Sequence, residues 1–506
     1  MTTHAPRGLL YLTSAITGFG VMGAEMSAGR LMAPYYGTST MVWALLIGAV
    51  MVSLAVGHVV GGWLSRQRRA LTLFFGSLMV SALMLALLPT VARPLMHDSL
   101  SWFRGGALGL LAASAVSVLG LLALPLIALG TSGPVLIHYA IDDRELAGVV
   151  AGRLYAFGTL GSLAGTYLTG VLLVPLWGTT RTFWLCALLL LANGLLGLLL
   201  SRRAGAAIAA ASSTLVLGFT AILLAPTPAI KPAGDSVLYE TESAYNYIQV
   251  RGEGHQRGLY LNDGFAVQTY HSTLGNLSLQ GTWRYYTQAP AWTTIGAPRR
   301  VLLLGLGGGG AALNYRTLYP EVEVTGVEID PVVVEVGRTY MGLPKETRVL
   351  SQDARTFLAR DNQTYDVIIT DAFDFPYIPF QLTTQEFFAQ VESRLAQGGV
   401  LVLNVGRYGP NYEVVDAIVQ TLKTQFPRVD GVDVGNSNTV LVAARHSADR
   451  DVGLGGLGLD RHTQRRLRGR PLRPWTPSPD APVLTDDRAP VEWLTDQVIF
   501  KTLLKM

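Results

Sequence analysis

Seven apolar stretches in the first 226 residues constrain the fold of this 506-residue chain more than any other feature. Each approaches or exceeds the roughly 20 helical residues that are needed to cross a bilayer. A helix satisfies its own backbone hydrogen bonds in lipid, so these stretches predict a multi-pass α-helical membrane domain of about seven helices. They lie near residues 8–33, 41–64, 70–92, 105–130, 149–174, 180–200 and 205–226.

Composition changes near Pro226 and divides the chain. Hydrophobic residues make up 50% of the sequence and charged residues only 15%, which is too apolar for a single soluble domain. Acidic residues are rare before Pro226 and common after it. We therefore expect a transmembrane domain over 1–226, a proline-rich linker over 227–234, a small antiparallel β domain over 235–290, a doubly wound α/β domain over 291–446, and a mobile tail with a C-terminal helix over 447–506.

Charge and cysteine content exclude some classes of protein. The net charge of +4 is small for this length and the basic residues are scattered, so we expect no nucleic acid as a partner. The single cysteine, Cys186, excludes an intramolecular disulfide and a CxxC metal site. We expect no metal and no prosthetic group, and the sequence is compatible with a homo-oligomer.

Three charged residues lie within or beside the apolar stretches. Glu25 and Arg30 fall in the first stretch, and Arg153 opens the fifth. A charge at membrane depth is costly, so it is usually paired or functional. We expect Glu25 to form a structural ion pair with Arg30 or Arg153, and a functional role is the alternative.

Residues 301–374 predict how the C-terminal half binds a ligand. The apolar strand VLLLGLGGGG is followed by VTGVEID, then SQDA, then YDVIITDAFD. An apolar strand that runs into glycines, with later strands that end in acids, is the pattern with which a doubly wound sheet binds a nucleoside. Gly305, Gly307 and Gly309 would let the backbone turn close to the ligand.

Four acids follow these strands. Glu328 ends the second strand, where a carboxylate can accept both ribose hydroxyls, and Asp353, next to Ala354, could accept from the adenine amino group. Asp371 and Asp374 follow the fourth strand, where they could take a proton from an ammonium and attract a cation. The alternative for Glu328 and Asp353 is an ordinary strand-end cap. For the other pair, the alternative is that either Asp371 or Asp374 caps the helix expected to begin near Thr383.

These motifs, together with LTTQEFF and LAQGGVLVLNV, resemble the spermidine synthases, and the whole chain resembles their membrane-fused bacterial relatives. The resemblance implies a small β domain followed by a class I methyltransferase-like (Rossmann-type) domain. It implies attack by an amine on the aminopropyl carbon of decarboxylated S-adenosylmethionine, which releases methylthioadenosine. The implied partners are the lipid bilayer, a nucleoside sulfonium and a polyamine, and the implied location is the bacterial inner membrane.

Site roles follow from the same resemblance. Glu328 resembles the ribose acid, Asp353 the adenine acid, and Asp371 the aspartate that deprotonates the attacking amine. Asp374 resembles the second acid of the family's D-x-x-D motif. The remaining candidates are Tyr245 and Asn246, which stand where the family has Tyr-Gln, and Gln268, which resembles the glutamine after the LDG turn.

The chain departs from the family at several positions, which leaves its reaction open. Gly308 stands where the family's glycine loop has an aspartate that holds the aminopropyl amine. The acidic D-E pair and the Y-H-E segment that follow the glutamine in the family are absent, and Tyr286 is the candidate to replace the tyrosine of that segment. Intact S-adenosylmethionine could then fit, and its own carboxylate or amine could attack its γ carbon to give a small ring. Methyl transfer, and a transporter or sensor that binds a nucleoside without turnover, are further alternatives.

Orientation in the membrane is the last expectation. Short loops rich in lysine and arginine usually lie in the cytosol, so we expect the basic loops 65–69 and 201–203 to be cytosolic. Seven crossings would then leave the C-terminal half outside, whereas an adenosylated sulfonium is made inside the cell. We expect a cytosolic catalytic domain, which requires that residues 105–140 make two passes, that one apolar segment is re-entrant, or that the charge rule does not hold for this chain.

Overall fold

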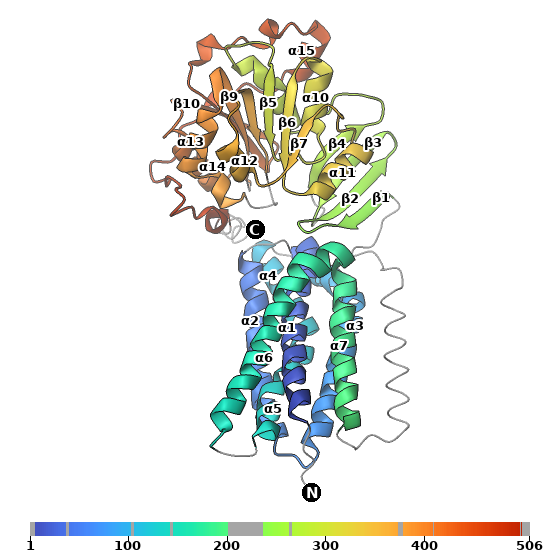
Figure 1. The fold of residues 1–506 in the computed structure, drawn as a ribbon. Coiled ribbons are helices and arrows are strands. Elements are labelled where there is room, and N and C mark those ends of the chain that lie inside the picture. The colour runs from blue at the N-terminus through green and yellow to red at the C-terminus, as the bar shows by residue number, and fades with distance from the viewer. Residues whose placement is uncertain are drawn as a thin grey trace. The chain divides into compact units, whose positions relative to one another are not determined.

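The computed structural model describes residues 6–36, 40–102, 106–141, 145–200, 236–262, 266–372, 378–407, 409–495 and 497. The expected seventh stretch (205–226), the linker (227–234) and Asp374 lie outside these residues. The chain divides into two compact units, one built from the N-terminal helices and one from the β-sheets (Figure 1). Each unit is described by itself.

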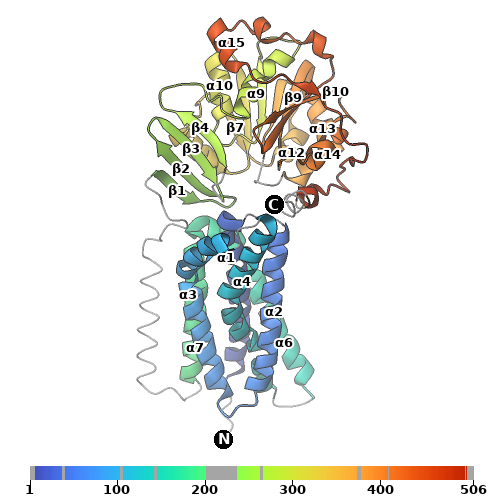
Figure 2. The ribbon, with the colours of Figure 1, turned by 180° about the vertical axis from the view of Figure 1, so that it is seen from behind.

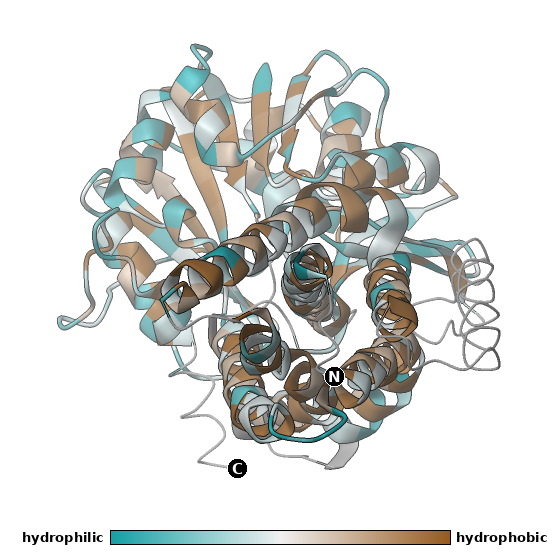
Figure 3. Ribbon diagram, turned by 60° about the horizontal axis from the view of Figure 1, so that its bottom comes forward, coloured by the Kyte–Doolittle hydropathy of each residue, from teal (hydrophilic) through white to brown (hydrophobic). Residues whose placement is uncertain are grey.

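The first unit is a helical bundle, as the apolar stretches predict. Figures 1 and 2 show its helices as long rods that run side by side, and Figure 3 shows that most of their residues are hydrophobic. Its elements are α1 (Arg7–Tyr36), α2 (Thr40–Leu64), α3 (Ala70–Trp102), α4 (Gly106–Gly130), α5 (Ser132–Ala140), α6 (Ala147–Leu168), the π-helical turn η1 (Thr169–Leu173) and α7 (Val174–Leu200).

Five stretches of this unit are long and apolar enough to cross a membrane: Arg7–Tyr36, Met41–Leu64, Ala70–Ser99, Ala112–Ala140 and Ala147–Leu200. The last has 54 residues and contains both stretches expected near 149–174 and 180–200. Gly178, with φ 80° and ψ 167°, interrupts the helix between them. Six of the expected stretches therefore fall on described helices.

Small residues allow α1 to pack closely against α6. A Cβ atom at Gly161 would lie 1.9 Å from the carbonyl oxygen of Ala15, and one at Gly165 would lie 2.6 Å from that of Phe19. Such backbone contact between helices is typical of packing within membranes. The ion pair expected for Glu25 is not found: Glu25 is 8% exposed and has no ionic partner among the described residues, and Arg153 is exposed.

The second unit begins with a small sheet, as the alternating sequence predicts. Its strands lie in the order β1 (Val237–Glu242), β2 (Tyr247–Glu253), β3 (Gln256–Leu261) and β4 (Val267–Ser272). β3 pairs antiparallel with both β2 and β4. Ile248, Val250 and Leu259 are buried together with Val333 and Met341, so the small sheet and the following α/β fold share a core.

The large sheet has eight strands in the order β12-β10-β11-β9-β8-β5-β6-β7. The strands from β7 to β9 are parallel, and β11, β10 and β12 extend the sheet in antiparallel register. Their bounds are β5 (Arg300–Leu304), β6 (Glu323–Glu328), β7 (Arg348–Ser351), β8 (Tyr365–Thr370), β9 (Leu395–Gly406), β10 (Arg428–Val434), β11 (Asn438–Ala444) and β12 (Arg473–Pro474).

Helices cover both faces of this sheet (Figures 1 and 2). Leu302 and Leu304 of β5 belong to one buried cluster, and Val301 and Leu303 belong to the other. Burial on both faces explains why the strand reads as a continuous apolar run. The helices are α9 (Trp283–Gln288), η2 (Ala289–Trp292), α10 (Gly310–Leu318), α11 (Pro331–Tyr340), α12 (Ala354–Arg360), η3 (Phe380–Leu382), α13 (Gln385–Ser393) and α14 (Glu413–Leu422).

The segment after residue 446, which we expected to be a mobile tail, packs onto this domain in its described part. It contains η4 (Ala448–Arg450), η5 (Leu454–Leu457), α15 (Arg461–Leu467) and β12, which pairs with β10. Leu484 and Val491 are fully buried in the core. The glycine- and arginine-rich composition of this segment is typical of a mobile surface. Its buried leucines are isolated in the sequence, so they form no periodic pattern that would predict a packed element.

Candidate nucleoside site

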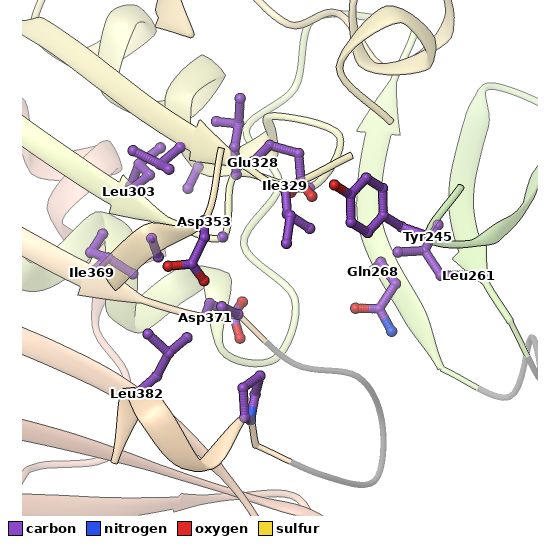
Figure 4. A pocket seen from close by; sticks show the side chains of 18 of the residues that line it. Tyr245, Leu261, Gln268, Leu303, Glu328, Ile329, Asp353, Ile369, Asp371 and Leu382 are labelled. Atoms are coloured by element: carbon purple, nitrogen blue, oxygen red, sulfur yellow. The ribbon is translucent and has the colours of Figure 1, made fainter. Parts of the chain in front are cut away.

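A cavity of about 240 Å³ lies at the carboxyl ends of β5, β6 and β8. This edge is where doubly wound sheets bind their ligands. Figure 4 shows Glu328, Asp353 and Asp371 around it, with Tyr245 and Gln268 on the side of the small sheet. Nearly all of the sequence-predicted site residues therefore line one cavity: Tyr245, Asn246, Gln268, Gly305, Gly307, Glu328, Asp353, Ala354 and Asp371.

Gly305 brings the loop after β5 next to the end of β8. Its φ is 89°, and a Cβ atom would lie 2.3 Å from the carbonyl oxygen of Asp371. Only glycine combines this backbone conformation with such a close approach. The loop is therefore held against the residue expected to act as the base.

Glu328 is tied to the glycine loop. Its Oε2 accepts a 2.8 Å hydrogen bond from the backbone N–H of Gly307, and its Oε1 accepts one of 3.2 Å from that of Asp330. Burial raises the pKa of Glu328, while these two hydrogen bonds oppose the shift. The carboxylate is thus fixed at the end of β6, where a ribose could meet it.

Asp353 has two roles. Its Oδ1 accepts a 2.8 Å hydrogen bond from the backbone N–H of Thr356 and so caps α12, as the structural alternative proposed. The same side chain lines the cavity (Figure 4). The cap fixes the carboxylate without removing it from the site.

Asp371 follows β8, lines the cavity and is partly buried. Burial raises the pKa of Asp371, while the hydrogen bond from Asn404 and the nearby Tyr286 hydroxyl favour the charged form. Nδ2 of Asn404 lies 3.0 Å from Oδ1 of Asp371. The Tyr286 hydroxyl lies beside the carboxyl without reaching full hydrogen-bond geometry, and burial and the charge of Asp371 raise the pKa of this phenol. A raised pKa in a cavity suits a carboxylate that accepts a proton.

The helix-cap alternative for Asp371 is wrong. The side chain of Thr384 caps α13 by accepting a 3.2 Å hydrogen bond from the backbone N–H of Phe387. The side chain of Asp371 is therefore not needed as a cap and lines the cavity. Asp374 lies outside the described residues, and its predicted role stays a prediction.

One predicted ligand-binding residue does not line the cavity. Gly309 has φ 85° and precedes α10, and a Cβ atom there would meet Leu343 at 2.4 Å. Gly309 is therefore needed for the left-handed turn before α10 and for close packing against Leu343. Gly308 is likewise not among the lining residues, and a Cβ atom there would meet Met341, Thr269 and Leu259 at 3.1–3.2 Å.

Several lining or supporting residues were not singled out from the sequence. Asn404 is the one amide in the buried apolar run 400–405 of β9, which is a usable signal for a buried hydrogen bond. Thr269 accepts a 3.0 Å hydrogen bond from the backbone N–H of Gly308. The lining residues that carried no local signal are Trp283, Ile329, Gln352 and Gln381. Among the described residues, no group of three or more His, Cys, Asp or Glu could hold a metal ion.

Comparison with known proteins agrees with this geometry. Residues 284–433 match the Spermine/spermidine synthase domain. A polyamine aminopropyltransferase from Pyrobaculum arsenaticum is 31% identical over 210 residues, which cover 38% of this chain and 69% of that protein. The chain belongs to the polyamine aminopropyltransferase family. The match to the domain covers β5, β6 and β8, whose ends form the cavity.

Two further relatives in the polyamine aminopropyltransferase family differ in how far they match. A probable polyamine aminopropyl transferase from Bifidobacterium longum is 30% identical over 298 residues, which cover 52% of this chain and 64% of that protein. Polyamine aminopropyltransferase 2 from Aquifex aeolicus is 24% identical over 438 residues, 82% of each chain. The chain thus spans somewhat less than two thirds of the Bifidobacterium relative, and the Aquifex match extends into the helical half.

Proposed function

We propose that this protein transfers the aminopropyl group of decarboxylated S-adenosylmethionine to an amine and releases methylthioadenosine. The observation that carries the proposal is Asp371, a partly buried carboxylate with a raised pKa in the cavity that Glu328 and Asp353 also line. Family membership supports the reaction type, since the relatives are named for aminopropyl transfer.

In this proposal Glu328 accepts hydrogen bonds from the ribose and Asp353 from the adenine amino group. The acceptor's amine nitrogen attacks the carbon beside the sulfonium, and a new C–N bond forms. The electrons of the broken C–S bond move to sulfur, which becomes the neutral thioether of methylthioadenosine. Asp371 accepts the proton that the amine loses, and the hydrogen bond from Asn404 holds its carboxylate in place.

A second candidate is cyclisation of intact S-adenosylmethionine without an acceptor. Gly308 stands where the family has an aspartate for the aminopropyl amine, and the described lining holds only three acids, Glu328, Asp353 and Asp371. Glu328 and Asp353 are assigned to the nucleoside, so only Asp371 remains to balance the positive charges of the sulfonium and of an amine acceptor. The ligand's own amine or carboxylate would attack its γ carbon, breaking the same C–S bond and giving methylthioadenosine and a small ring.

One assay separates the two candidates. Purified full-length protein in detergent would receive S-adenosylmethionine or its decarboxylated form, each with and without putrescine or spermidine, and products would be identified by mass spectrometry. Methylthioadenosine together with an acceptor-dependent polyamine supports transfer. Methylthioadenosine from intact S-adenosylmethionine alone supports cyclisation. No methylthioadenosine under any of these conditions would refute both.

We also propose that the helical unit holds the enzyme in the bacterial inner membrane with the catalytic domain in the cytosol. The five apolar stretches support the anchoring. The side can be tested with a single cysteine at the exposed Asp480 in a chain whose only natural cysteine, Cys186, is replaced by alanine. A membrane-impermeant maleimide should label this cysteine in lysed cells only; labelling in intact cells with a sealed inner membrane would contradict the proposal.

A further inference from the structure

A second cavity lies apart from the nucleoside site, between α9 and the segment that contains α15. Its volume is about 450 Å³, which is within the usual range for small-molecule sites. Its lining combines apolar Leu277 and Leu279 with Gln280 and four arginines: Arg284, Arg465, Arg466 and Arg468. No acidic residue is among the lining residues.

The charge of these arginines is not balanced by nearby acids. Within the described residues, the recorded salt bridges involve none of the four. Asp460, at the start of α15, accepts hydrogen bonds from the backbone N–H groups of His462 and Thr463. Asp433 lines the adjoining cavity, where it already pairs with Arg407. Arg465, Arg466 and Arg468 are exposed and Arg284 is partly buried, so an anion at this cavity would meet four guanidinium groups that form no ion pair within the described residues.

The arginines are carried by elements that pack firmly together. The Nε of Arg284 donates to the carbonyl oxygen of Leu279 at 3.3 Å. Leu467, between Arg466 and Arg468, is fully buried. The backbone N–H of Arg470 donates to the Tyr285 hydroxyl at 3.1 Å, and Gly469 lies against the same ring. The backbone segments that carry the arginines are therefore fixed by packing and hydrogen bonds.

We propose that this cavity binds an anion with two or more phosphate groups, such as a nucleoside diphosphate or triphosphate. A guanidinium group presents paired donors that match phosphate oxygens, and four such groups can neutralise more than one phosphate. Leu277 and Leu279 offer an apolar surface beside the charges. The cavity also shares α9 with the nucleoside site, because Arg284 lines one and Tyr286 lines the other.

The test measures binding to the full-length protein in detergent by isothermal titration calorimetry, with sodium triphosphate and ATP as probes. Dihexanoyl phosphatidylglycerol and a 20-nucleotide DNA duplex serve as further arms. We expect saturable binding of triphosphate, which weakens at least about tenfold in Arg465→Glu/Arg466→Glu because two charge-assisted contacts are lost. The matched control is Arg348→Glu/Arg360→Glu, which reverses two exposed arginines of the same domain outside the cavity.

The milder variant Arg465→Gln/Arg466→Gln guards against misfolding and should show the same loss with an unchanged melting temperature. Binding of triphosphate or ATP that depends on Arg465 and Arg466 identifies a free phosphate compound as the ligand. Binding of the lipid headgroup in their place would overturn the proposal, because phosphatidylglycerol presents a single phosphate. Absence of saturable binding, equal weakening in the control variant, or binding of DNA alone would overturn the proposal.

Discussion

The side-chain amide of Asn404 donates a 3.0 Å hydrogen bond to Oδ1 of Asp371. Thr370 of β8 pairs with Leu403 of the neighbouring parallel strand β9. Asp371 comes directly after Thr370 and Asn404 directly after Leu403, so the pairing of the strands brings the two side chains together. The orientation of the proposed base is therefore set by sheet register rather than by a loop. An amide donor also stabilises the ionised form, which is the form that can accept a proton.

Replacement of Asp371 by asparagine should reduce methylthioadenosine formation by about 10²–10⁴-fold, the usual contribution of a general base. The side chain keeps its size but can no longer take the proton. The measurement is turnover by mass spectrometry. Asp480→Asn, which changes an exposed acid of the same domain, should keep full activity. Undiminished turnover by Asp371→Asn would remove Asp371 from the mechanism.

Replacement of Asn404 by leucine should move the acidic limb of the pH–rate profile to higher pH. Activity needs ionised Asp371 and falls as pH drops through its pKa, which burial has already raised. Loss of the donated hydrogen bond raises that pKa further. Thr370→Val is the control, because the Thr370 hydroxyl has no hydrogen-bond partner among the described residues. An unshifted profile in Asn404→Leu would show that this bond does not tune the base.

Replacement of Glu328 by glutamine should weaken nucleoside binding about tenfold, because one charged hydrogen-bond acceptor becomes neutral. Glu328 is proposed to touch the ribose rather than the reacting carbon. We therefore expect KM for the sulfonium substrate to rise while kcat changes less. Steady-state kinetics and calorimetric titration with methylthioadenosine check the two quantities. A loss confined to kcat would argue for a different role.

Replacement of Gly308 by aspartate restores the family's residue but should destabilise the domain by about 1–3 kcal/mol, as overpacking usually does. The new Cβ would meet Met341, Thr269 and Leu259 at 3.1–3.2 Å. Thermal unfolding should show a lower midpoint than in Gly455→Asp, where a Cβ has no neighbour within 4 Å. Equal midpoints would mean that the neighbours of Gly308 can move aside.

Replacement of Leu484 by alanine should lower the free energy of unfolding by about 2–5 kcal/mol, the usual cost for a buried leucine. Leu484 is 0% exposed, whereas the adjacent Val483 is 37% exposed. Val483→Ala therefore serves as the control and should change stability far less. The comparison is made by chemical denaturation of the full-length protein. Equal effects would indicate that the segment around Leu484 does not belong to the core.

The acids of the site could be predicted from the sequence because parallel strands bring their carboxyl ends to one edge. Glu328 ends one strand, Asp353 and Asp371 follow two others, and this order along the sequence was enough to place them together. The helical bundle was predictable for a similar reason, since each apolar stretch is long enough to specify its own helix.

Features that depend on contacts across the fold could not be predicted. The role of Asn404 depends on the register of two strands whose residues lie 33 positions apart. The packed surroundings of Gly308 come from β3, β4 and Met341, none of which is adjacent in sequence. The pairing of β12 with β10 involves only two residues of each strand, which is too short to leave a pattern in the sequence.

The buried leucine and valine near the end of the described chain affect the timing of biosynthesis. Ribosomes deliver the chain from its N-terminus, so the apolar helices emerge first. The core around Leu484 and Val491 cannot close until those residues have been made. The α/β domain therefore reaches its native structure only after all the apolar helices have been synthesised, and a nascent chain stalled before Leu484 would expose apolar surface to chaperones and proteases.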